Sequence, residues 1–249
     1  MVDGSNIDSP LAALRTTASH TIAVPHLVEL LRVVPAGASL EEYRSAVVDE
    51  NVLARPTLAG RQRSFRHLRE LYLLDPRRRS FAALRRVWDV DVDAQPLLAG
   101  VFAVTRDEIL RASYAAVVRT PIGAVVTSAA LTEAVRMQIG DSLSDSTLNK
   151  TGRNTAACWT QTGHLIGRTN KVRAAVESRP VAIALAAYLG HLSGGRGVGV
   201  LESPSSLVLD LPSGRPLEVL RQAHAQGLLD LLVAGNVVDV SFSMLEGSL

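Results

Sequence analysis

Cysteine is almost absent from this chain, and its scarcity excludes several kinds of protein. Cys158 is the only cysteine among the 249 residues, so neither an intramolecular disulfide nor a cysteine-based metal cage can form. Long apolar runs are also lacking, because the most apolar stretch, residues 181–189, falls far short of the roughly 20 residues that span a bilayer. The first residues are polar and acidic, unlike a signal peptide. We therefore expect a cytoplasmic protein with no membrane contact.

Catalytic motifs are lacking as well. The six histidines are scattered with no pair at metal-ligand spacing, and no carboxylates flank them in a catalytic arrangement. Residues 193–200 have the glycines of a phosphate-binding loop, but no Lys-Ser or Lys-Thr pair follows them. We therefore predict that the protein is not an enzyme and has no cofactor and no metal site.

Lysine is rare, so arginine supplies nearly all of the positive charge; the only lysines are Lys150 and Lys171. The formal net charge is only +2, yet the cations gather in two stretches. Residues 55–86 contain ten arginines against two acidic residues, and residues 145–179 contain six cations against two acidic residues. A GC-rich coding sequence explains the preference for arginine but not this clustering. Clustered cations suit a polyanion-binding surface, because affinity for a duplex comes largely from neutralised phosphates.

Residues 144–162 have the pattern of a DNA-reading helix, with Ser142 or Ser144 placed as its N-cap. At about 100° per residue, one face is small and apolar: Leu148, Thr151, Gly152, Thr155 and Trp159. The opposite face offers hydrogen-bond donors and cations: Ser146, Asn149, Lys150, Arg153, Asn154, Ala157 and Gln161. Arginine suits guanine, asparagine and glutamine suit adenine, and serine and lysine suit phosphate oxygens. The alternative is an ordinary amphipathic helix with a solvated outer face.

A small basic wing is expected after this helix. Gly163 is placed to end the helix in a left-handed conformation. A short apolar pair, residues 165–166, predicts a strand, and three cations follow it: Arg168, Lys171 and Arg173. The wing of a winged-helix protein usually touches backbone phosphate, so these cations are predicted phosphate contacts.

Two helices are predicted upstream, over residues 105–120 and 127–140. Thr105 is placed as the N-cap of the first, with Glu108 three residues on as the partner in a capping box. Thr127 is placed as the N-cap of the second. Three helices, a tight turn and a wing match the order of a winged-helix unit.

Four segments are predicted along the chain. Residues 1–22 form a loose N-terminal arm, and residues 23–104 form a helical domain with a basic surface. Residues 105–175 form the winged-helix-like DNA-binding unit. Residues 178–249 form an α+β, winged-helix-like module with short extended pieces and a terminal β-hairpin around Gly235-Asn236. Because that hairpin contains Asp230 and Asp239, we interpret the last module as a packing or partner-binding unit. The fold class is therefore mostly α.

Two stretches resemble a known family. The run DENVLARPTLAGRQRSFRHLRELYLL at residues 49–74 and the run STLNKTGRNTAACWTQTGHLIG at residues 146–167 are similar to blocks of the BrxA-like proteins, small accessory components encoded in BREX phage-defence systems. The resemblance covers about residues 40–167, roughly half of the chain. Pro56 departs from the family pattern.

This resemblance implies a mostly helical protein that binds double-stranded DNA without catalysis. It would act beside a methyltransferase, an alkaline-phosphatase-like protein and an ATPase encoded in the same locus. The block 55–57 and the helix 61–69 correspond to the family's basic helix. Lys150, Arg153 and Asn154 correspond to its second basic helix, nearer the carboxyl end.

We therefore predict a non-catalytic, double-stranded DNA-binding accessory protein of a bacterial phage-defence system. The predicted DNA-binding residues are Arg61, Arg63, Arg66, Arg69, Ser146, Asn149, Lys150, Arg153, Asn154, Arg168, Lys171 and Arg173. Three alternatives remain open: a scaffold whose basic surfaces dock acidic partners in the defence complex, a winged-helix transcriptional regulator, and an RNA-binding protein that uses its N-terminal helical domain.

Overall fold

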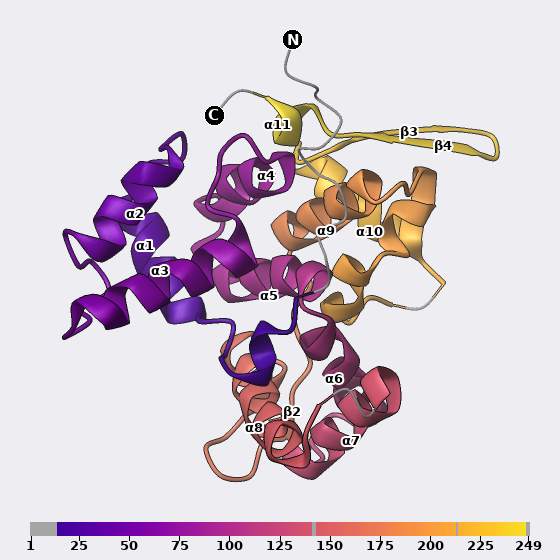
Figure 1. Cartoon of the computed structure of the whole chain (residues 1–249). Coiled ribbons are helices and arrows are strands. Elements are labelled where there is room, and N and C mark those ends of the chain that lie inside the picture. The colour runs from indigo at the N-terminus through magenta and orange to yellow at the C-terminus, as the bar shows by residue number, and fades with distance from the viewer. Residues whose placement is uncertain (1–13, 141–142, 213, 248–249) are drawn as a thin grey trace.

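Helices dominate the computed structural model, which describes residues 14–140, 143–212 and 214–247 (Figure 1). The N-terminal group consists of α1 (Val24–Val33), α2 (Leu40–Val48), α3 (Leu58–Tyr72) and α4 (Arg79–Trp88). The middle group consists of α6 (Glu108–Arg119), α7 (Ser128–Ile139), α8 (Asp145–Gln161), β1 (Leu165–Ile166) and β2 (Val172–Arg173). The C-terminal group consists of α9 (Pro180–Leu192), α10 (Pro216–Ala225), β3 (Asp230–Ala234), β4 (Val237–Ser241) and α11 (Ser243–Glu246).

Helix α5 (Gln95–Arg106) lies at the centre of these three groups (Figure 1). Every residue from Leu97 to Val104 is buried, which is the pattern of a helix surrounded by protein rather than lying on a surface. One continuous hydrophobic core extends from Ile22 to Leu245. The middle group adds a small core of its own, formed by Ala18, Ile109, Ala112, Val135 and Leu148.

Side-chain caps set the starts of several helices. Ser39 and Glu42 form a capping box at α2, Thr57 caps α3, and Thr127 caps α7 as predicted. The predicted cap at Thr105 is wrong, because that residue lies within α5. Asp107 caps α6 instead, where its carboxylate accepts from the Leu110 N–H at 2.9 Å.

The Asp107 carboxylate also holds the first described residues in place. Asp107 accepts from the hydroxyls of Thr16 and Thr17 and from the Thr17 N–H, at 2.6, 2.7 and 2.9 Å. Leu14 forms a parallel bridge with Asp107, and Ile22 is fully buried. The predicted loose arm is therefore wrong for residues 14–22, while residues 1–13 lie outside the described residues.

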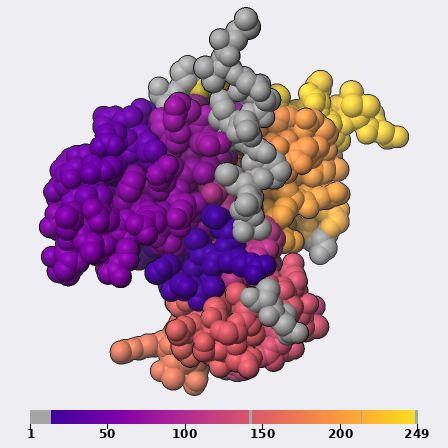
Figure 2. All heavy atoms as spheres, viewed as in Figure 1, coloured from indigo at the N-terminus to yellow at the C-terminus, as the bar shows by residue number. Residues whose placement is uncertain are grey.

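The segment predicted as a wing forms a small β-sheet. Strands β1 and β2 pair antiparallel, and residues 123–126 lie on the other side of β2. The Val126 N–H donates to the Lys171 carbonyl at 2.8 Å, and the Arg173 N–H donates to the Ala124 carbonyl at 2.9 Å. Gly163 has a φ of 85° and ends α8 as predicted. The loop between β1 and β2 protrudes at the lower left of Figures 1 and 2.

The C-terminal group contains the predicted hairpin and two departures from prediction. Strands β3 and β4 pair antiparallel around Gly235-Asn236 and project from the body (Figure 1). The extended pieces predicted after Val200 are wrong over residues 204–209, which form the 3-10 helix Pro204–Leu209, and a second 3-10 helix, Gly197–Leu201, lies at the end of the predicted glycine-rich turn. A short helix, α11, follows the hairpin and packs on α4.

Gly152→Ala should destabilise the middle group, because α7 and α8 cross in contact at Gly152. A Cβ added there would lie 2.2 Å from Thr132 Oγ1 and 2.4 Å from the Ser128 carbonyl oxygen. Overpacking of this kind costs about 1–3 kcal/mol, which urea unfolding would measure. Gly37→Ala is the matched control, because an added Cβ meets nothing within 4 Å there. Equal stability of the two variants would contradict the close crossing.

Candidate nucleic-acid interface

The N-terminal half of α8 presents the predicted polar face to solvent. Ser144 caps the helix by accepting from the Thr147 N–H, and the other candidate cap, Ser142, lies outside the described residues. The predicted inner face is buried throughout, from Leu148 to Trp159. On the outer side four predicted site residues are exposed: Ser146, Asn149, Lys150 and Arg153. The amphipathic pattern therefore orients this half of the helix as expected.

The C-terminal half of α8 is covered by the segment that precedes α1. The Asn154 amide donates to the carbonyl oxygens of Thr17 and Ala18, both at 3.3 Å. Gln161 Oε1 accepts from the Val24 N–H at 3.0 Å. Figure 2 shows this indigo segment between the N-terminal and middle groups. The prediction that Asn154 reads bases is wrong, since its amide donors are engaged within the protein.

Two of the three cations predicted for the wing are accessible in the β1–β2 hairpin. Arg168 is exposed in the loop between β1 and β2, and Lys171 is half-buried, with its Nζ donating to the Gly167 carbonyl at 3.1 Å. The third prediction is wrong. Arg173 is only 4% exposed and its Nη2 lies 2.5 Å from Asp210 Oδ1, so it cannot contact phosphate.

Three cations converge beside the start of α7. Arg153, Arg168 and Lys171 line one hollow of about 350 Å3, together with Thr127 and Ser128. Lys150 is exposed one turn earlier on α8. None of these four cations forms an ion pair with a carboxylate in the described parts of the chain. The first-turn amides of a helix also favour anions. The arrangement is a cationic concavity without internal counter-ions.

The α3 arginines divide between two places. Arg61 is partly buried and donates to the carbonyl oxygens of Val48 and Arg55, at 3.1 and 3.4 Å, so it holds the loop before α3. Arg66 and Arg69 are exposed and line a second hollow of about 360 Å3 with Arg44. Arg63 is exposed but lines a different hollow. The predicted arginines of α3 therefore do not form one continuous surface.

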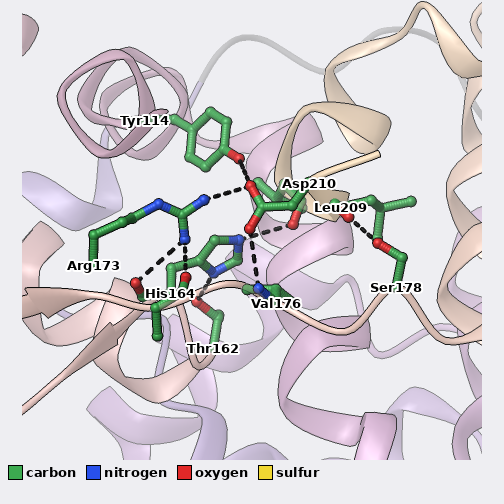
Figure 3. Close-up of polar contacts among 10 residues, drawn as sticks. Tyr114, Thr162, His164, Arg173, Val176, Ser178, Leu209 and Asp210 are labelled. Atoms are coloured by element: carbon green, nitrogen blue, oxygen red, sulfur yellow. Dashed lines mark hydrogen bonds and ion pairs between the residues drawn. The ribbon is translucent and has the colours of Figure 1, made fainter. Parts of the chain in front are cut away.

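A buried polar network, which the sequence analysis did not find, joins the β1–β2 hairpin to the C-terminal group (Figure 3). Asp210 accepts from Arg173, from the Tyr114 hydroxyl at 3.0 Å and from the Val176 N–H at 3.0 Å. Burial favours a higher pKa for the Asp210 carboxyl, but the hydrogen bonds from Arg173 and Val176 outweigh it and lower the pKa. No short-range signal marks this network, because its members lie far apart in the sequence.

His164 belongs to the same buried region. Its Nε2–H donates to the Val208 carbonyl at 2.8 Å, so Nδ1 accepts from the Thr162 hydroxyl at 2.8 Å (Figure 3). Burial lowers the pKa of His164 to about 4. The ring is therefore neutral in the folded protein and acts as a structural bridge.

Stability should fall as the pH falls from about 6.5 to about 4. An unfolded histidine has a pKa near 6.5, so over this window the unfolded state binds a proton that the folded His164 does not. The loss from His164 alone is about 3 kcal/mol. Burial also lowers the pKa of His26 and of His67, which adds in the same direction. Urea unfolding at several pH values measures the slope, and His164→Gln should flatten it. An unchanged slope in that variant would contradict the assignment.

No arrangement for metal chemistry is found in the described residues. No group of three or more His, Cys, Asp or Glu side chains there is placed to hold a metal ion. Across the same residues, no helix combines the length and the apolar character that crossing a bilayer requires.

No family model matches the sequence, and a search of the curated proteins finds no match.

Proposed function

We propose that this protein binds double-stranded DNA without catalysing a reaction, as an accessory component of a bacterial phage-defence system of the BREX type. The observation that carries the DNA-binding part is the convergence of Arg153, Arg168 and Lys171 on one hollow, beside the exposed Lys150. Unpaired cations at such a surface neutralise phosphates. The resemblance of residues 40–167 to BrxA-like proteins supports the assignment to phage defence.

Residues 105–175 are proposed as the winged-helix unit that docks on the duplex. Their order is helix α6, the paired segment 123–126, helices α7 and α8, strand β1, the wing loop and strand β2. In helix-turn-helix proteins the N-terminal residues of the second helix contact base edges in the major groove. That half of α8 is the exposed half. Lys150 and Arg153 then lie toward the groove, and Arg168 and Lys171 contact the backbone.

Sequence preference should be weak. With Asn154 engaged by Thr17 and Ala18, the side chains left to read bases on α8 are Asn149, Lys150 and Arg153. Phosphate contacts position a protein on DNA but carry no sequence information. A transcriptional regulator with one tight operator is therefore a weaker candidate than a general duplex binder.

Fluorescence anisotropy tests the proposal. A labelled random-sequence DNA duplex is compared with an RNA duplex and a DNA single strand of the same length. We expect the tightest binding to the DNA duplex, with Kd on the order of micromolar or below, the tight end of non-specific binding. Tighter binding to the RNA duplex would move the function to RNA recognition.

A second candidate function is docking of a protein partner, and the C-terminal hairpin favours it. Leu232, Val233 and Val237 are exposed on the projecting strands. Exposed apolar side chains gathered on one element mark contact sites more often than scattered ones do. Binding to another defence component that persists at raised salt concentration, as apolar contacts do, with no binding to DNA, would support this function over duplex binding.

A further inference from the structure

The hollow that Arg63 lines lies where the loop 51–57 and the first turns of α3 meet the segment before α1. Its volume is about 410 Å3, within the range of small-ligand sites, roughly 300–1,000 Å3. Its polar lining comes mainly from three histidines and two arginines: His20, His26, His67, Arg55 and Arg63. None of its described lining residues is acidic, and none is shared with the hollow at Arg153.

Arg55 is held in place at this hollow without a counter-ion. Its Nε donates to Ser64 Oγ at 3.1 Å, and its Nη2 donates to His26 Nε2 at 3.0 Å. Among the described residues no carboxylate pairs with it. In contrast, Arg179 is ion-paired with Asp91 at 2.9 Å. A fixed guanidinium with unused donors matches the geometry of a phosphate group.

The backbone around Arg55 is held in a strained conformation. Asn51 and Ala54 both have left-handed φ values, 57° and 50°. Asn51 Oδ1 accepts from the Arg55 N–H at 2.7 Å. Left-handed conformations at non-glycine residues are unfavourable and concentrate at binding sites. Helix α3 also begins here, and the residues Thr57 and Gly60 of its first turn line the hollow. Its N-terminal end adds a favourable potential for an anion.

Two of the histidines, His26 and His67, contribute polarity rather than charge. His26 accepts from Arg55 and is therefore neutral, and the Nε2–H of His67 donates to the Thr21 carbonyl at 2.7 Å. Burial lowers the pKa of His26 and of His67. The fixed positive charge of the hollow thus comes from Arg55 and Arg63. Two positive charges match a phosphomonoester, which carries about −1.5 to −2 at pH 7, better than they match a singly charged phosphodiester.

We propose that this hollow binds a phosphomonoester, with Arg55 and Arg63 holding the phosphate and the remaining volume holding the attached nucleoside. The phosphomonoester has two sources: a free mononucleotide, or the 5′-phosphorylated end of a DNA strand. This proposal does not rest on the proposed duplex binding. The hollow shares no lining residue with the hollow at Arg153, and the mononucleotide probe contains no duplex.

Histidine ring signals in the NMR spectrum test this site directly. Adenosine monophosphate, inorganic phosphate and adenosine are titrated in turn. We expect saturable shifts of the His26 and His67 rings with the monophosphate, a weaker response to phosphate, and none with adenosine. The proposal would be overturned if neither adenosine monophosphate nor inorganic phosphate produced a saturable shift of these rings.

Matched variants place the binding in this hollow. Arg55→Gln should weaken binding of the monophosphate at least tenfold. Arg63→Gln, at an exposed position with no internal ion pair in the described chain, should also weaken it without changing stability. Arg32→Gln, which removes an exposed charge paired with Glu29, is the control and should bind as the wild type does. Equal affinity in all of these proteins would place the ligand elsewhere and overturn the proposal.

Duplexes with and without a 5′-phosphate distinguish the two sources. Tighter binding of the phosphorylated duplex that is lost in Arg55→Gln would identify a strand end as the ligand. Equal binding of the two duplexes, with the mononucleotide still bound, would identify the free nucleotide. A variant with Lys150→Glu and Arg153→Glu should bind the mononucleotide normally, which separates failure of this site from failure of duplex binding.

Discussion

Duplex affinity should fall at least tenfold when Lys150 and Arg153 are both replaced by glutamate. Both side chains are exposed on the N-terminal half of α8, and Arg153 lines the same hollow as Arg168 and Lys171. The change removes two phosphate neutralisations and introduces repulsion, so a loss of about 1.4 kcal/mol, which is tenfold in Kd, is the minimum expected. Anisotropy with a random-sequence duplex measures it.

A charge-matched variant controls for net charge. Arg215→Glu with Arg221→Glu makes the same change in charge at and just before α10, on the C-terminal group. This control should lose much less affinity. Equal losses of duplex affinity in the two variants would show that binding depends on net charge and not on the position of these side chains. Unchanged affinity in the α8 variant would place the duplex site at Arg66 and Arg69 on α3.

Asp210→Asn should lower the free energy of unfolding by about 3–5 kcal/mol, the usual cost of leaving a buried charge unpaired. Arg173 is 4% exposed and Asp210 is its ion-pair partner. Asparagine keeps the shape and tolerates the left-handed φ of 47° at this position. Its amide nevertheless presents a donor where Arg173 and the Val176 N–H require acceptors. Urea or thermal unfolding measures the loss.

Two further variants test whether the loss of stability comes from the unpaired buried charge rather than from the loss of any ion pair. Glu29→Gln breaks the exposed pair with Arg32 and should cost less than about 1 kcal/mol. Adding Arg173→Met to Asp210→Asn removes the buried charge and should recover part of the stability. A single Asp210→Asn variant as stable as the wild type would contradict the role of this pair in joining the β1–β2 hairpin to the C-terminal group.

Local chemistry in the sequence predicted much of the helical framework. Ser144 and Thr127 are caps, Gly163 ends α8, and the hairpin turns at Gly235-Asn236. Each of these features depends on residues a few positions apart. Neighbouring residues alone could not decide between Thr105 and Asp107 as the cap, because Asp107 also accepts hydrogen bonds from Thr16 and Thr17, about 90 residues earlier.

The site prediction was wrong at residues whose side chains are engaged by contacts with distant parts of the chain. Asn154 has the position and chemistry of a base-reading residue, but it binds the backbone 137 residues earlier in the sequence. Arg173 follows the basic pattern of the wing, but it pairs with a carboxylate 37 residues later. Periodicity places both residues on the correct element and contains no information about what covers them. Lys150, Arg153, Arg168 and Lys171 remain as predicted contacts, because no long-range partner neutralises them in the described structure.

The salt dependence of duplex binding tests the central claim most directly. If Lys150, Arg153, Arg168 and Lys171 each neutralise one phosphate, the logarithm of the binding constant should fall with the logarithm of salt concentration with a slope of about −3 to −4, and participation of the α3 arginines would make it steeper. Anisotropy with a random-sequence duplex at several salt concentrations gives the slope. Binding with such a slope would support an electrostatic duplex-binding protein. Absence of binding at low salt would contradict it and leave docking of a protein partner as the better account.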